Sequence, residues 1–228
     1  MTVEFPGGNP SKNTKGFLAR PKEAGTYPAV IVIHEIWGLV DHIKDVTNRL
    51  AHEGYASLAV DLFEEKIVTK LEEGRELREK FSEEKILADL KGALTYLKTL
   101  SFVKPSRMGS VGFCMGGGLS LLLACHNMEV APVIFYGRNP SPIELVKNLQ
   151  KPILGNYAGA DMAITESDII LLKETLTKYG KKFDIKTYPG APHAFFNDTS
   201  ASFRTDAARD AWERTLNFFN KELKSQNR

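Results

Sequence analysis

The stretch VGFCMGGG, residues 111–118, places a cysteine among glycines where an apolar run ends. Cys114 has Gly112 and Gly116 two positions away on either side, and a leucine-rich run follows. This is the Gly-x-nucleophile-x-Gly pattern of a sharp strand-to-helix turn, which presents a nucleophile at the edge of a sheet. The N–H groups and partial positive charge of the helix that follows would stabilise a thiolate and an oxyanion alike. The pattern favours Cys114 as a nucleophile over a buried packing residue.

A phosphate-binding loop and a disulfide are two alternatives for Cys114 and its glycines. A glycine triplet can cradle a phosphate, but there is no Gly-x-Gly-x-x-Gly pattern and no Lys-Ser/Thr pair follows. Cys125 would lie ~16 Å from Cys114 on a helix rising ~1.5 Å per residue, which is too far for a disulfide. We therefore expect two free thiols, with Cys125 a packing residue.

A nucleophile of this kind needs an acid and a histidine later in the chain, in that order. Asp161 comes 47 residues after Cys114 and follows the apolar run KPILGNYAG. His193 comes another 32 residues on, after the run FDIKTYP. Both positions fall at carboxyl ends of expected strands, where open parallel sheets build their sites. An aspartate there is often a helix cap and a lone histidine is often structural, but together they predict a triad.

A second cluster, HEIWG at residues 34–38, follows the apolar run PAVIVI. In a sheet of this type the loop at this place supplies the second N–H of the oxyanion hole. We expect Glu35 to be functional, the alternative being a solvated surface charge. His34 ends the strand and is a further titratable candidate.

Apolar runs alternate with segments of helical period, which predicts an α/β fold with a mostly parallel sheet and helices on both faces. We expect one domain over residues 1–228. The expected strands are residues 16–21, 28–34, 56–62, 107–114, 130–137, 151–159 and 183–189. The expected helices are residues 42–54, 83–100, 116–125, 166–180 and 205–224. The highly charged residues 63–81 look like an insertion, helical in part, that could lie over a site as a lid.

Composition argues against several classes of protein. The 228 residues include 30 basic and 28 acidic ones, a net charge of +2, which is too balanced for a nucleic-acid or membrane surface. No stretch has the ~20 apolar residues of a membrane span, and no secretory signal is visible at the start. We expect a cytoplasmic protein, a monomer or weak homodimer.

The motifs HEIWGL, GFCMGG, GAD and PHAF, in this order and spacing, resemble the dienelactone hydrolase family, the carboxymethylenebutenolidase-like α/β-hydrolases. The resemblance covers roughly residues 10–222. It implies that Cys114 attacks an ester or lactone carbonyl, that His193 is the general acid/base, and that Asp161 orients it. It also implies that Glu35 helps to generate the thiolate when substrate binds, and it implies no metal or organic cofactor.

By position, the resemblance places the oxyanion hole at the backbone N–H groups of Ile36 and Met115. Family members that open lactones often have an arginine four residues after the histidine, where this chain has Asn197. Asn197, Trp37 and Arg78 are the substrate-binding candidates. A less acidic ester or lactone than dienelactone itself is therefore expected as the substrate.

The chain is thus expected to be a cysteine-dependent hydrolase of small esters or lactones that forms a thioester acyl-enzyme. Three alternatives stay open. One is a non-catalytic binding protein on the same fold, and another is a peroxide-sensitive thiol protein. The third is a peptidase or thioesterase that uses the same triad.

Overall fold

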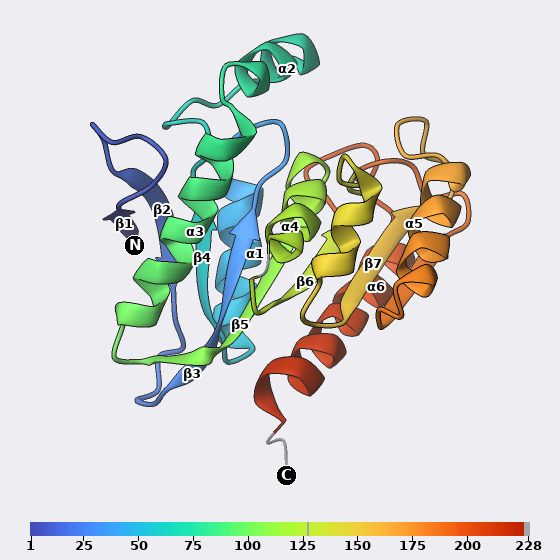
Figure 1. Ribbon diagram of the computed structural model, residues 1–228. Coiled ribbons are helices and arrows are strands. Elements are labelled where there is room, and N and C mark those ends of the chain that lie inside the picture. The colour runs from blue at the N-terminus through green and yellow to red at the C-terminus, as the bar shows by residue number, and fades with distance from the viewer. Residues whose placement is uncertain (127, 226–228) are drawn as a thin grey trace. The chain divides into compact units, whose positions relative to one another are not determined.

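A computed structural model describes residues 1–126 and 128–225 (Figure 1). The chain divides into two compact units, Met1–Met108 and Gly109–Arg228, and each is described by itself. The boundary falls inside one strand, β5 (Val103–Phe113). A single domain over residues 1–228 stays a prediction.

The first unit is a mixed sheet with helices against it. Its strands are β1 (Thr2–Phe5), β2 (Thr14–Ala19), β3 (Tyr27–Ile33) and β4 (Ala56–Val60). They lie in the order β1-β2-β4-β3, with β3 and β4 parallel and the other two pairings antiparallel. Helices α1 (Asp41–His52) and α3 (Glu83–Thr99) cover opposite faces, which is why β3 is almost entirely buried (Figure 1). The short helix α2 (Leu71–Glu79) stands apart from the strands.

The second unit continues from β5 in the order β5-β6-β7-β8, and the pairs β6/β7 and β7/β8 are parallel. Its further strands are β6 (Val130–Phe135), β7 (Ile153–Ala158) and β8 (Phe183–Tyr188). Its helices are α4 (Met115–Cys125), the 3-10 helix η1 (Ile143–Asn148), α5 (Glu166–Lys178), α6 (Thr205–Phe219) and the π-helical η2 (Asn220–Lys224). In Figure 1, α4 lies in front of the strands and α6 behind them.

Every strand and helix expected from the sequence is present, and the structure adds two elements, β1 and η1. β1 has only four residues with alternating burial, which is too short a pattern to separate from a loop. The helix η1 had no recognised signal in the sequence. The helix α2 confirms the expectation that the charged residues 63–81 are helical in part. No helix in the described part of the chain is long and apolar enough to cross a membrane.

Candidate active site

Cys114 lies at the turn between β5 and α4, as the glycine pattern predicts. β5 ends at Phe113 and α4 begins at Met115, so Cys114 alone makes the turn. Its backbone has φ 54° and ψ −116°, a strained conformation for a residue with a Cβ atom. Its N–H donates to the Phe135 carbonyl of β6 at 3.0 Å, which holds the turn against the neighbouring strand.

Glycine is required near Cys114 because neighbouring backbone segments approach too closely for a Cβ atom. A Cβ atom on Gly112 would overlap the Gly116 carbonyl, because the strand and the helix meet there without a spacer. A Cβ atom on Gly117 would lie 2.6 Å from the carbonyl oxygen of Phe135. The turn therefore tolerates no larger side chain at Gly112.

Asp161 and His193 meet in the second unit, although 32 residues separate them. The His193 Nδ1–H donates to Asp161 Oδ2 at 2.7 Å, and the Asp161 side chain is fully buried. The other carboxylate oxygen accepts the N–H groups of Ala163 at 2.8 Å and Ile164 at 3.1 Å. Burial by itself would raise the pKa of Asp161, but the hydrogen bond from His193 and those two N–H groups hold it below its usual range. Asp161 is thus a fixed, ionised partner for the imidazole.

The other side of His193 meets the nucleophile candidate. Its side chain hydrogen-bonds that of Cys114 as well as that of Asp161. Burial lowers the pKa of His193, but the hydrogen bonds and negative charges of these two partners prevail and raise it from 6.5 to about 10. The arrangement favours an imidazolium at neutral pH, held between a carboxylate and a sulfur.

Two features of the second unit hold the His193 loop in place. Gly159 donates its N–H to the Tyr188 carbonyl at 2.8 Å, and Ala160 donates to the Ala191 carbonyl at 2.9 Å. These bonds tie the Asp161 loop to the segment just before His193. The buried ring of Tyr136, at φ 40°, packs against the imidazole with ring centroids 5.0 Å apart. Sequence reasoning missed Tyr136, whose only signal was its place at the end of an expected strand.

The HEIWG loop lies in the first unit directly after β3. Glu35 is 1% exposed and Ile36 is 8% exposed, so Glu35 is not a solvated surface charge. Trp37 is half-buried. His34 is fully buried and its ring bridges this loop to the segment after β4. Burial lowers its pKa, although the Glu35 carbonyl and the charge of Asp61 oppose that shift.

The charged residues 63–81 are fastened to this loop within the first unit. The Val68 N–H donates to the Trp37 carbonyl at 3.2 Å. Gly74 of α2 lies so close to Ile36 that an added Cβ would sit 2.7 Å from the Ile36 side chain. Arg78 is half-buried and donates to the Phe81 carbonyl at 2.8 Å, so part of its hydrogen-bonding capacity holds its own segment.

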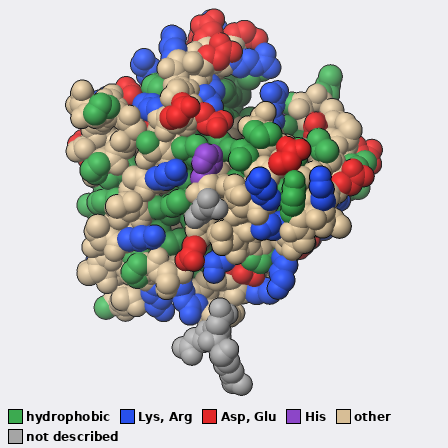
Figure 2. Space-filling view, in the orientation of Figure 1, with side chains coloured by type: hydrophobic (Ala, Val, Ile, Leu, Met, Phe, Trp, Pro, Cys, Tyr) green, Lys and Arg blue, Asp and Glu red, His purple; other side chains and the backbone are tan. Residues whose placement is uncertain are grey.

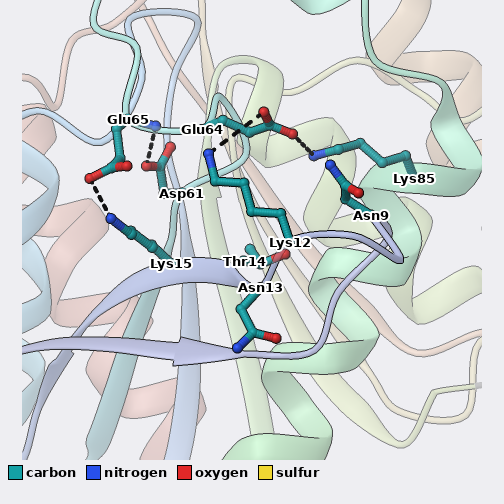
Figure 3. Close-up of a pocket in the computed structure, with 9 residues that line it drawn as sticks. All are labelled: Asn9, Lys12, Asn13, Thr14, Lys15, Asp61, Glu64, Glu65 and Lys85. Carbon is teal, nitrogen blue, oxygen red and sulfur yellow. Dashed lines mark hydrogen bonds and ion pairs between the residues drawn. The ribbon is translucent and has the colours of Figure 1, made fainter.

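Ion pairs hold the beginning of the same segment (Figure 3). Glu64 lies 3.3 Å from Lys85 and 4.0 Å from Lys12, and Glu65 pairs with Lys15 at 2.8 Å. The pocket they line encloses about 10 Å³, roughly the space of one water. Because each lysine faces a carboxylate, we interpret this pocket as an ion-pair network and not as an anion site.

Asn197 lies buried in the loop after His193. Its Oδ1 accepts the Thr199 N–H at 3.0 Å and the Thr199 hydroxyl at 2.7 Å. This is a turn-stabilising arrangement that asparagine commonly makes. A substrate contact by Asn197 stays a prediction, and the structure adds a structural role.

The two cysteines are free, as expected, and they differ in surroundings. Cys125 is fully buried, and burial raises its pKa to about 12. Cys114 is partly exposed. Within the described residues, no three His, Cys, Asp or Glu side chains gather closely enough to hold a metal ion. Figure 2 shows acidic and basic side chains interspersed on one face, with a concentration of both over α2 at the top.

A mostly parallel sheet with helices on both faces, and a strand-to-helix elbow followed in chain order by an acid and a histidine, define the α/β-hydrolase fold. Comparison with known proteins identifies the family within this fold. The dienelactone hydrolase family matches residues 14–223. The chain therefore belongs to the dienelactone hydrolase family.

Individual proteins agree with this assignment. A protein of Saccharolobus solfataricus named "Putative carboxymethylenebutenolidase" is 37% identical, over 92% of this chain and 95% of its own length. One of the same name from Synechocystis is also 37% identical, over 94% and 95%. The crystal structure of a "Putative Dienelactone Hydrolase" from Klebsiella pneumoniae has a TM-score of 0.89 at 30% identity, covering 97% of this chain and 98% of that one. The expected fold and the expected enzyme class, a carboxylic-ester hydrolase, are thereby confirmed.

Proposed function

We propose that this protein hydrolyses small carboxylic esters or lactones through a Cys114–His193–Asp161 triad and a thioester acyl-enzyme. The observation that carries the proposal is the chain of side-chain contacts from Asp161 through His193 to Cys114. Cys114 is partly exposed at the tip of an elbow with a strained backbone, and such strain often marks a functional site.

The reaction follows from these contacts. The Cys114 thiolate, paired with the His193 imidazolium, attacks the ester carbonyl and forms a tetrahedral oxyanion. The oxyanion collapses to a thioester as His193 gives its proton to the departing alcohol. His193 then takes a proton from water, the resulting hydroxide attacks the thioester, and the acid leaves with Cys114 restored. Asp161 keeps the imidazole in the required tautomer throughout.

Two backbone N–H groups are proposed to stabilise the oxyanion. Met115 is the first residue of α4, so its N–H is one of the donors that a helix leaves unpaired at its start. Ile36 supplies the second, and each donor contributes on the order of 3 kcal/mol to the transition state. Glu35, buried on the same loop as Ile36, is proposed to assist formation of the thiolate when substrate binds.

The substrate is proposed to be a small, weakly acidic ester or lactone. Trp37, Arg78 and Asn197 remain the candidates for contacting it. The Asn197 position carries no cationic side chain, which is the reason to expect a substrate without a second carboxylate there. We further propose a cytoplasmic monomer or weak homodimer without a cofactor. The two free thiols suit a reducing compartment.

The test is hydrolysis of 4-nitrophenyl acetate by the wild type, Cys114→Ala and Cys125→Ala. The first substitution should bring the rate close to that of buffer, because members of a catalytic unit act together. Cys125→Ala is the matched control and should retain the wild-type rate. Wild-type turnover by Cys114→Ala would refute the proposal. Peroxide consumption that needs Cys114, without any ester cleavage, would instead support a thiol-redox protein.

A further inference from the structure

His34 makes two backbone hydrogen bonds from a fully buried ring. Its Nδ1 lies 2.5 Å from the carbonyl oxygen of Glu35, the next residue. Its Nε2 lies 3.2 Å from the N–H of Leu62, just after β4. The ring also meets Phe63 edge-on, with centroids 5.0 Å apart. The imidazole therefore joins the loops that follow two neighbouring parallel strands.

These partners determine which tautomer His34 adopts. A carbonyl oxygen can only accept, so Nδ1 carries a hydrogen and donates it to Glu35. The Leu62 N–H can only donate, so Nε2 carries no hydrogen and accepts. If His34 were protonated, Nε2 would carry a hydrogen and two donors would face each other at Leu62. Burial lowers the pKa of His34 and therefore disfavours that protonation. The acidic residues of these two loops are Glu35, Asp61, Glu64 and Glu65. The charge of Asp61 favours protonation of His34. The two carboxylate oxygens of Asp61, however, already accept the N–H groups of Phe63 and Glu65.

The bond to the Glu35 carbonyl has a consequence for the next residue. The peptide linking Glu35 to Ile36 is trans and planar, so its C=O and N–H point in opposite directions. Holding the carbonyl against His34 therefore sets the direction of the Ile36 N–H. In the part of the chain that the structure describes, that N–H donates to no residue, although Ile36 is only 8% exposed. A buried backbone donor without an acceptor is uncommon and needs a partner.

We propose that His34 is a positioning residue for ester hydrolysis: its Nδ1–H holds the Glu35 carbonyl, and through the rigid peptide it fixes the direction of the Ile36 N–H, the proposed oxyanion donor. This inference rests on the proposed function, in which Ile36 supplies an oxyanion donor. His34 does not touch the reacting atoms. Without its bond to Glu35, the peptide is free to rotate and the donor is lost for part of the time.

Two conservative variants separate the roles of the two ring nitrogens. Counting bonds from Cβ, the side-chain amide of asparagine sits where Nδ1 does, and that of glutamine sits where Nε2 does. His34→Asn can still donate to the Glu35 carbonyl but loses the bond from Leu62. His34→Gln can still accept from Leu62 but loses the bond to Glu35. Each variant therefore lacks one of the two hydrogen bonds made at the same buried position.

The experiment measures kcat, KM and urea unfolding for the wild type and both variants with 4-nitrophenyl acetate. For His34→Gln we expect kcat to fall on the order of 10² with KM nearly unchanged, since an oxyanion donor acts in the transition state. For His34→Asn we expect kcat within about threefold of wild type and an unfolding midpoint similar to that of the Gln variant. If His34→Gln does not fold, His34→Ala replaces it, and the Asn variant must then exceed the Ala variant in kcat.

A spectroscopic measurement gives a second readout. A trifluoromethyl ketone accepts the Cys114 thiolate at its carbonyl carbon, which forms a C–S bond and leaves a tetrahedral oxyanion. In ¹⁵N-labelled protein this adduct should move the Ile36 amide proton downfield in the wild type and in His34→Asn, but not in His34→Gln.

Failure of the His34 proposal can be distinguished from failure of the proposed triad. Equal kcat for the Asn and Gln variants, or losses that follow stability alone, would overturn the role of His34 and leave the triad standing. An Ile36 amide proton that does not respond to the adduct in the wild type would also overturn it. Ester turnover that survives Cys114→Ala would overturn both proposals together.

Discussion

The substitution Asp161→Asn keeps the shape of the side chain and removes its charge. Its amide oxygen can still accept the N–H groups of Ala163 and Ile164, as Asp161 Oδ1 does now. Its NH2 group then faces His193 Nδ1, which donates to the carboxylate in the native protein. Two donors cannot pair, so the imidazole is driven to the tautomer with its hydrogen on Nε2, toward Cys114. That tautomer cannot take the thiol proton.

The raised pKa of His193 gives the free energy that favours its protonated form. A pKa raised from 6.5 to about 10 corresponds to roughly 5 kcal/mol in favour of the imidazolium. The hydrogen bond that His193 donates to Asp161 is the largest cause of the increase, followed by its hydrogen bond with Cys114, and both act against burial. Without the carboxylate the largest cause of the increase is lost, so the pKa of His193 falls. A thiol needs less help from a base than a hydroxyl does, so we expect kcat to fall by roughly 10²–10⁴.

The assay is kcat for 4-nitrophenyl acetate together with an NMR titration of His193. The matched control is Asp168→Asn in the same unit, because Asp168 caps α5 through Thr165. That control should lose about 1 kcal/mol of stability and keep its kcat. A kcat for Asp161→Asn within twofold of wild type, or equal losses in both variants, would refute the reasoning.

Three further predictions concern the same unit. Gly112→Ala should yield little folded protein, because its Cβ overlaps the Gly116 carbonyl; soluble, active Gly112→Ala protein would contradict the strand–helix contact. Brief iodoacetamide treatment at pH 8 should label Cys114 and leave Cys125 unlabelled, since burial raises the pKa of Cys125 to about 12; peptide mass spectrometry decides this. A histidine with a raised pKa stabilises the folded state below its unfolded pKa of 6.5 and loses that effect as pH rises to about 10. The difference in unfolding free energy between wild type and His193→Gln should therefore shrink from pH 6 to pH 10, and urea titrations showing growth instead would contradict it.

Much of the fold was predictable because its signals are local. Nearly continuous apolar runs separated by helical periods predict buried parallel strands, and β3, β4, β6 and β7 appear where expected. β1 was missed because a four-residue edge strand carries little periodic signal. The segment 63–81 was recognised only as a charged insertion, helical in part. Its packing against Trp37 and Ile36 joins residues 31 and 38 positions apart, which no local pattern records.

The candidate site divides in the same way. The elbow at Cys114 follows from a strand, two small neighbours and a helix that are adjacent in the chain, and the order of strands then indicates where an acid and a histidine must come. Tyr136 was not predicted, because an aromatic residue at a strand end looks like core. Asn197 was expected to meet substrate by analogy of position, whereas its Oδ1 also serves the local turn at Thr199.

The residue types and their spacing were enough to specify a thiol at a strand–helix turn with an acid and a histidine after it, because each signal lies within about ten neighbouring residues. The tertiary structure alone decided the state of those groups. The pKa of His193 depends on two partners, 32 and 79 positions earlier in the chain, at Asp161 and Cys114. The direction of the Ile36 N–H depends on a ring held by Leu62, 28 positions from His34. Burial and hydrogen bonds between distant segments set charge and orientation, and no local pattern records them.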